Sequence, residues 1–159
     1  MFKRGTFIVL ILIALLLVCS CKNEPEPNHE VEKIAGAGVL ASVDIISQYS
    51  ETGSYTGVSL KTTDNTACFS FTNATVSTDL SSIDASMGTH TIKVNGEVVY
   101  TYEAYPATYP FSLSYNISFS YAGSNHTLEL KGRATGVSTQ SFSLLKVDGK
   151  SYDPSVMNK

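Results

Sequence analysis

The chain has 159 residues with 11 basic and 14 acidic side chains, so its formal net charge at pH 7 is −3. This length fits one ordinary domain with an added targeting segment, and a domain of this size can bury a core without disulfides or metals. The basic residues form no cluster, which excludes nucleic acid and anionic lipid head groups as expected partners.

The first residues are organised as a secretory signal. Lys3 and Arg4 give a positive start, and an unbroken run of twelve apolar residues follows from Phe7 to Val18. A membrane-spanning helix needs about 20 apolar residues. A charged start, a short apolar core and a small residue at its end are typical of a cleaved signal. The alternative is a retained transmembrane anchor, which no second apolar stretch or basic stop-transfer run supports.

The run Val18-Cys19-Ser20-Cys21 resembles a bacterial lipobox, with an aliphatic residue at −3, a small residue at −1 and cysteine at +1. This resemblance covers the first 21 residues, and cysteine at −2 is its one departure from the usual pattern. It implies a bacterial lipoprotein: a diacylglyceryl thioether on Cys21, cleavage after Ser20 by a type II signal peptidase, and N-acylation, for instance by palmitate. Two or three acyl chains exceed the marginal binding of one chain, so we expect stable membrane attachment.

The cysteine count leaves one thiol in the folded part of the chain. Cys19 leaves with the signal and Cys21 is lipidated, so Cys68 has no partner for an intramolecular disulfide. We interpret Cys68 as a small buried hydrophobe. The alternatives are an intermolecular disulfide and a reactive thiol, which needs a neighbouring histidine or cation.

Three parts of the chain follow from these observations. Residues 1–20 are the signal, residues 21–38 are the lipidated cysteine and an extended tether, and residues 39–159 are a single domain. The tether prediction depends on the prolines and acidic residues of 23–30, which have no core-forming pattern. By resemblance to proteobacterial sorting, Lys22 after the lipidated cysteine favours the outer over the inner membrane of the cell envelope.

Residues 34–50 fit two structures. One set of apolar residues would line a helix: Val39, Leu40, Val43 and Ile46. Another set would line one face of a strand: Val39, Ala41, Val43 and Ile45. Because Gly36 and Gly38 disfavour a helix, we predict a strand from Leu40 to Tyr49.

From residue 55 onward, apolar and polar residues alternate in short runs separated by turn residues. Strands are predicted at 55–62, 67–76, 89–94, 97–103, 111–121, 127–131, 137–147 and 150–152. Asn95-Gly96 and Asp148-Gly149 each predict a hairpin turn, because such turns need positive φ. The fold class is therefore all-β: an antiparallel β-sandwich of about seven to eight strands, with a small up-and-down barrel as the alternative.

The sequence contains no recognised catalytic or metal-binding motif. His29, His90 and His126 have no second histidine at ligand spacing, and the cysteine count excludes a cysteine-rich zinc site. Asp79 and Asp84 share a serine-rich loop without the alternating spacing of a calcium loop. Nucleotide-binding and hydrolase motifs are absent, so we expect no cofactor, no metal and no enzymatic activity.

A cluster of tyrosines marks the best candidate for an interaction loop: Tyr102, Tyr105 and Tyr109. Aromatic loops can stack on sugars or anchor a protein partner, while ordinary packing beneath the proline-containing loop is the alternative. The sequence thus predicts a membrane-anchored monomer with a non-enzymatic binding domain for a protein or glycan. A lipocalin-like carrier of a small apolar ligand is the alternative, and a hydrolase with a dispersed site is less favoured.

Overall fold

The computed structural model describes residues 27–103, 109–136 and 139–157. The signal, Cys21 and Tyr105 lie outside these ranges. The described elements are α2 (Pro27–Thr52), β1 (Val58–Thr62), β2 (Thr66–Asp79), β3 (Thr89–Tyr102), β4 (Phe111–Tyr121), β5 (Ser124–Gly136), β6 (Thr139–Val147), β7 (Lys150–Tyr152) and the 3-10 helix η1 (Pro154–Met157).

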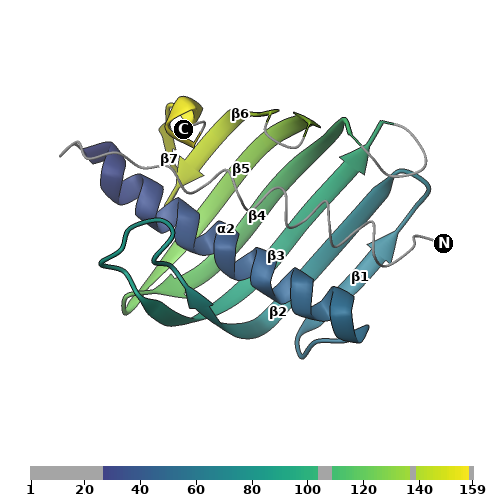
Figure 1. Cartoon of the computed structure of the whole chain (residues 1–159), viewed down its shortest axis with the longest axis horizontal. Helices are drawn as coiled ribbons and strands as arrows, with labels where there is room; N and C mark the ends of the chain where they lie inside the picture. The colour runs from purple at the N-terminus through teal and green to yellow at the C-terminus, as the bar shows by residue number, and fades with distance from the viewer. Residues whose placement is uncertain (1–26, 104–108, 137–138, 158–159) are drawn as a thin grey trace.

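The seven strands form one antiparallel sheet in chain order, from β1 at one edge to β7 at the other (Figure 1). Each strand pairs with its neighbours in sequence, so the connections are local. The prediction of an antiparallel β domain with seven to eight strands is confirmed. The sheet is open, since β1 and β7 do not pair with each other.

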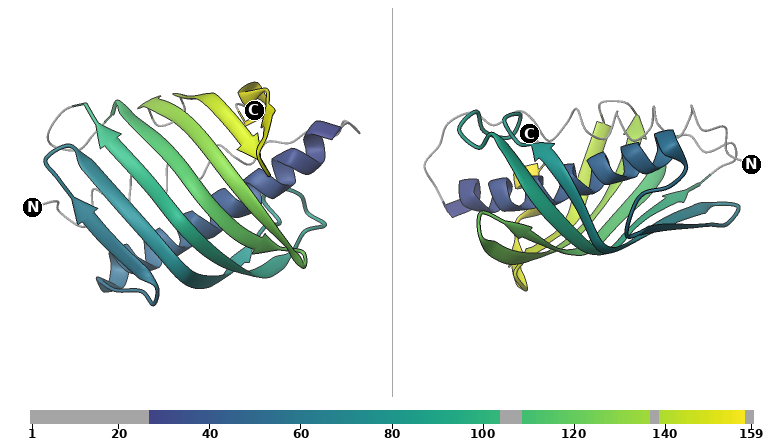
Figure 2. Two further views of the ribbon diagram at one scale, coloured as in Figure 1. Left: turned by 180° about the vertical axis from the view of Figure 1, so that it is seen from behind. Right: turned by 90° about the horizontal axis from the view of Figure 1, so that it is seen from below.

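Helix α2 lies across the inner face of the sheet, and the sheet curves around it (Figure 2). The helix contacts β2 to β6 and η1. Alternate residues of each strand point at α2, and their burial follows the period of two that the sequence shows. The core therefore lies between α2 and the sheet, and it includes Ile45, Phe69, Ile92, Val98, Leu128 and Leu145.

Two predictions for the first part of the domain are corrected by α2. Residues 40–49 are helical, where we expected a strand, and residues 27–38 are helical, where we expected an extended tether. Val31 is only 6% exposed, so the core begins well before residue 39. The helix ends at Thr52, and Gly53 follows it with a φ of 79° and donates its N–H to the Tyr49 carbonyl at 2.7 Å. No helix in the described part of the chain has the length and apolar composition needed to cross a membrane.

The two glycines that disfavour a helix lie where the backbone of α2 is close to neighbouring side chains. A Cβ on Gly38 would lie 2.6 Å from Cε1 of Phe119 on β4, and a Cβ on Gly36 would lie 2.7 Å from Cδ1 of Ile83. Their neighbour Ala37 is fully buried. Small side chains thus let the helix backbone approach the sheet, and the burial gained there outweighs the helix propensity that each glycine loses.

The Asn95-Gly96 pair is not a hairpin turn, which corrects a third prediction. Both residues lie inside β3, which continues from Thr89 to Tyr102. Gly96 has a φ of 105°, and a Cβ there would overlap the Asn116 carbonyl oxygen of β4. On the other side, β2 has a bulge at Asn73, whose N–H donates to Asn95 Oδ1 at 2.8 Å. Bulges bend and twist a strand, so this position helps the sheet to curve around α2.

The second predicted turn is confirmed. Asp148 and Gly149 have φ values of 52° and 76°, and Val147 pairs with Lys150 across the turn. Residues 111–121 form β4 with the bounds that the alternation predicts.

The close packing of Gly38 predicts that Gly38→Ala lowers the free energy of unfolding, whereas helix propensity alone predicts that it raises it. Propensity alone favours alanine over glycine by about 1 kcal/mol, whereas overpacking a core costs about 1–3 kcal/mol. We expect Gly38→Ala to lower the free energy of unfolding by about 1–2 kcal/mol in urea denaturation. Gln48→Ala, on an exposed position of the same helix, should change it by less than about 0.5 kcal/mol. A Gly38→Ala protein more stable than the wild type would contradict the close contact.

Candidate functional site

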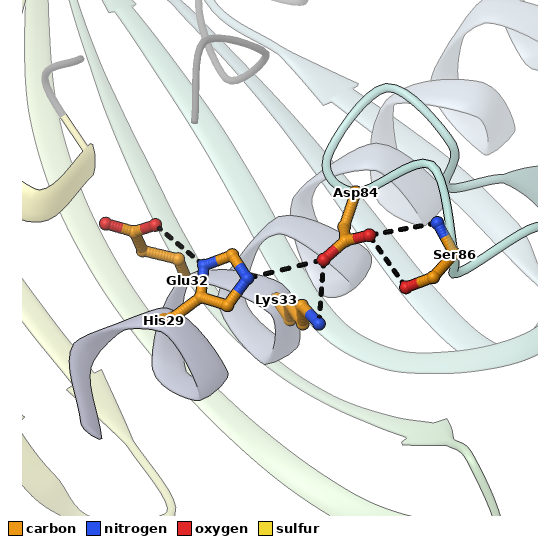
Figure 3. A network of polar contacts seen from close by, with 5 residues as sticks. All are labelled: His29, Glu32, Lys33, Asp84 and Ser86. Carbon is orange, nitrogen blue, oxygen red and sulfur yellow. Dashed lines mark hydrogen bonds and ion pairs between the residues drawn. The ribbon is translucent and has the colours of Figure 1, made fainter. Parts of the chain in front are cut away.

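The first turns of α2 are fastened to the 80–88 loop by a network of polar side chains (Figure 3). Asp84 Oδ2 lies 2.8 Å from Lys33 Nζ and 3.3 Å from His29 Nε2. Its other oxygen, Oδ1, accepts hydrogen bonds from the Ser86 N–H at 2.9 Å and the Ser86 hydroxyl at 2.7 Å. Lys33 and Ser86 together hold the pKa of the Asp84 carboxyl well below its usual range. The network therefore fixes the start of the helix to the loop through an ionised carboxylate.

The oxygen-rich loop does not assemble a set of metal ligands. Asp79 accepts a hydrogen bond from the Ser81 N–H at 2.9 Å, while Asp84 is held by Lys33 and Ser86. Within the described residues, no three histidine, cysteine, aspartate or glutamate side chains gather where they could hold a metal ion. Both aspartates thus serve to shape their own turns.

Two histidines make local contacts at the ends of strands. His126 Nδ1 lies 2.9 Å from Asp148 Oδ2, and the other oxygen of Asp148 accepts the Thr127 N–H at 2.8 Å. His90 Nε2 lies 2.7 Å from the Met87 carbonyl oxygen. In the described ranges neither imidazole is hydrogen-bonded to a serine hydroxyl. These contacts tie the β6–β7 turn to β5 and the 80–88 loop to β3.

The candidate interaction loop is only partly described, since Tyr105 lies outside the described residues. Tyr102 is 3% exposed at the end of β3, with its ring centroid 5.8 Å from that of Phe111. Tyr109 is half-buried and stacks on the other side of this cluster, 5.4 Å from Phe111. Burial raises the pKa of the Tyr102 hydroxyl. Tyr102 therefore belongs to the core, and binding by this loop stays a prediction that concerns Tyr105 and Tyr109.

Cys68 is half-buried, which corrects the expectation of a fully buried thiol. It lies on the outer face of β2, in register with Lys61 of β1 and Val99 of β3. The outer face is not covered by another layer among the described residues, so the side chain keeps contact with solvent.

Two surface hollows bear on the candidate site, and the larger of them lies where α2 ends, beside the bulge of β2. Its volume is about 870 Å³, and it is lined by Gln48, Glu51, Thr52, Ser54, Tyr55, Thr56, Asn73 and Thr75. Two of its hydroxyls donate to backbone carbonyls: Tyr55 donates to the Thr75 carbonyl at 2.7 Å, and Thr52 donates to the Gln48 carbonyl at 2.8 Å. Its one charged lining side chain is Glu51, an anion.

The smaller hollow, of about 320 Å³, lies on the outer face of the sheet across β3 to β6. We name it the outer hollow; it is lined by Val99, Thr101, Ser112, Leu113, Ser114, Lys131, Gly132, Arg133, Ser141 and Ser143. Arg133 Nη2 pairs with Glu103 Oε1 at 2.6 Å. Among the described residues, no acidic side chain forms an ion pair with Lys131. The volume of the outer hollow is at the lower end of the range for small-ligand sites, about 300–1,000 Å³.

The sequence did not reveal the outer hollow as a site. Lys131 and Arg133 are two residues apart in β5, so they share a face. The serines of residues 111–121 also share a face. What the sequence does not give is the register that places Arg133 beside Ser112 of β4 and Ser141 of β6.

Comparisons with protein-family models, with curated proteins and with solved structures found no match for this chain.

The Asp84 network predicts a pH-dependent contribution to stability. A carboxyl whose pKa is lowered by folding stabilises the folded state above the unfolded value of about 3.9, and this stability is lost as the pH falls below it. The loss becomes large only as the pH approaches the lowered folded pKa. We expect Asp84→Asn to lower the melting temperature at pH 7 and to lower it less at pH 2. Asp64→Asn, in an exposed turn, should have a small effect of equal size at both pH values. An equal loss for Asp84→Asn at pH 7 and pH 2 would show that the contact is not ionic.

Proposed function

We propose that this chain is a lipid-anchored protein of the bacterial cell envelope whose β domain is a non-enzymatic binding module. The anchor is the acylated Cys21, and the signal before it is removed. The observation that carries the proposal is the lipobox-like run Val18–Cys21 followed directly by a folded domain that starts at Pro27. Lys22 favours the outer membrane, and the domain acts as a monomer.

The short distance between Cys21 and α2 supports a position close to the membrane. An extended chain covers at most about 3.3–3.6 Å per residue, so Pro27 lies within roughly 20 Å of the lipidated cysteine. The Asp84 network fixes the first turns of α2 to the 80–88 loop. The domain is therefore held beside the membrane surface through α2, with little freedom to move away from it.

The binding role is supported by which face of the sheet is available. Helix α2 covers the inner face, where a lipocalin-like carrier would hold its ligand. The outer face carries the outer hollow with its two cations and its serine and threonine side chains. His90 and His126 each contact a neighbouring loop or turn, so we assign both side chains a structural role. We therefore assign the binding role to the outer face.

Metabolic labelling tests the anchor. We expect labelled palmitate to enter the wild-type protein and the Cys19→Ser control, because only Cys21 carries the lipid. The Cys21→Ser protein should take up no label and should be recovered in the soluble fraction. Equal labelling of the Cys21→Ser and wild-type proteins would overturn the lipobox assignment.

A further inference from the structure

We propose that the outer hollow binds an acidic carbohydrate, a sugar or oligosaccharide that carries carboxylate groups. This inference deepens the proposed function, since it rests on the binding role of the β domain and names its class of ligand. It does not depend on the lipid anchor.

The register of four strands brings the polar side chains of the outer hollow into neighbouring rows. One row runs across the sheet through Thr101, Ser112, Arg133 and Ser141. The next row contains Val99, Ser114 and Lys131. Adjacent strands lie about 4.8 Å apart and alternate residues of one strand about 6.6 Å apart. A hydroxylated ring lying on this surface would thus meet donors and acceptors from at least two strands.

The bulge between β5 and β6 adds another hydroxyl to the outer hollow. The register shifts between Lys131, which pairs with Leu144, and Gly132, which pairs with Phe142. The extra residue of β6 at this point is Ser143, which lines the outer hollow together with Ser141. Bulges redirect side chains and are frequent beside functional sites.

The hydroxyls of the outer hollow have unused hydrogen-bonding capacity. Within the described residues, the side chains of Thr101, Ser112, Ser114, Ser141 and Ser143 form no hydrogen bond with another protein group. In the larger cleft, Thr52 and Tyr55 donate to backbone carbonyls at 2.8 and 2.7 Å, and the one charged lining side chain is the anionic Glu51. A serine or threonine hydroxyl is one donor and two acceptors, which matches the hydroxyl groups of a sugar.

The charges of the outer hollow favour an anion. Lys131 forms no ion pair with another described residue, and its exposed ammonium has three donors. Arg133 pairs with Glu103 through Nη2, while a guanidinium has five N–H donors. Charge-assisted hydrogen bonds to a carboxylate are stronger than neutral ones. Two cations among several hydroxyls therefore fit a ligand with both carboxylate and hydroxyl groups better than a simple anion or a neutral sugar.

Isothermal titration calorimetry of the purified protein with tetragalacturonic acid tests this proposal. We expect saturable binding that weakens as NaCl is added, because salt screens exposed charges. Maltotetraose, a neutral oligosaccharide, should bind at least tenfold more weakly. Lys131→Gln and Arg133→Gln should each weaken tetragalacturonate binding at least tenfold, while Lys146→Gln should leave it unchanged within twofold. Lys146 is the matched control, since it lies on the outer face of β6 and pairs with Glu129 at 3.1 Å.

Control ligands and a folding control distinguish specific binding from general anion binding and from misfolding of the variants. Equal affinity for inorganic phosphate or for tetraglutamate would show a general anion site and overturn the proposal, as would no binding of tetragalacturonate. The variants should keep the wild-type circular dichroism spectrum, because Lys131 forms no ion pair within the described part of the chain and exposed pairs such as Arg133–Glu103 contribute little to stability. If the protein does not bind tetragalacturonate but is still labelled by palmitate, only the proposed ligand class is overturned. Lost labelling overturns the anchor and leaves the binding result standing.

Discussion

The close packing of α2 against the concave face of the sheet is the constraint on which the rest of the structure depends. Gly38 meets the Phe119 ring and Gly36 meets Ile83, so the helix backbone lies nearer to its neighbours than larger side chains would permit. The sheet must curve to reach both sides of the helix. The positive φ of Gly96 and the bulge at Asn73 provide that curvature in β3 and β2. One seven-stranded sheet and one helix thus enclose a complete core.

This arrangement also decides which surfaces are available for function. The inner face is used for packing, so its apolar residues contribute to stability rather than to binding. The outer face stays open, and there the register places Lys131 and Arg133 among serine and threonine hydroxyls. The proposed anchor would hold the domain through the same helix, because α2 begins six residues after Cys21 and is tied to the 80–88 loop by Asp84. The packing of α2 therefore bears both on the proposed attachment and on the location of the candidate site.

The sequence predicted what depends on local alternation and missed what depends on tertiary contact. The strand at 111–121 and the Asp148-Gly149 turn are predictable because period two and turn chemistry act within a few residues. The segment 34–50 fits a helix or a strand equally well, and the glycine penalty of about 1 kcal/mol each is outweighed only by burial against Phe119 and Ile83. The turn preference of Asn95-Gly96 is overridden because β4 approaches Gly96 too closely for a side chain. The outer hollow depends on the register of four strands, which no single segment contains.

Amide hydrogen exchange over residues 31–46 tests most directly the claim that α2 is part of the folded core. A helix that packs in the core opens only with large-scale unfolding, whereas a solvated tether exchanges without protection. The account predicts that these amides are protected to the same degree as those of 113–119 in the middle of β4. Exchange at the rate of an unstructured chain over residues 31–46, with β4 still protected, would contradict it.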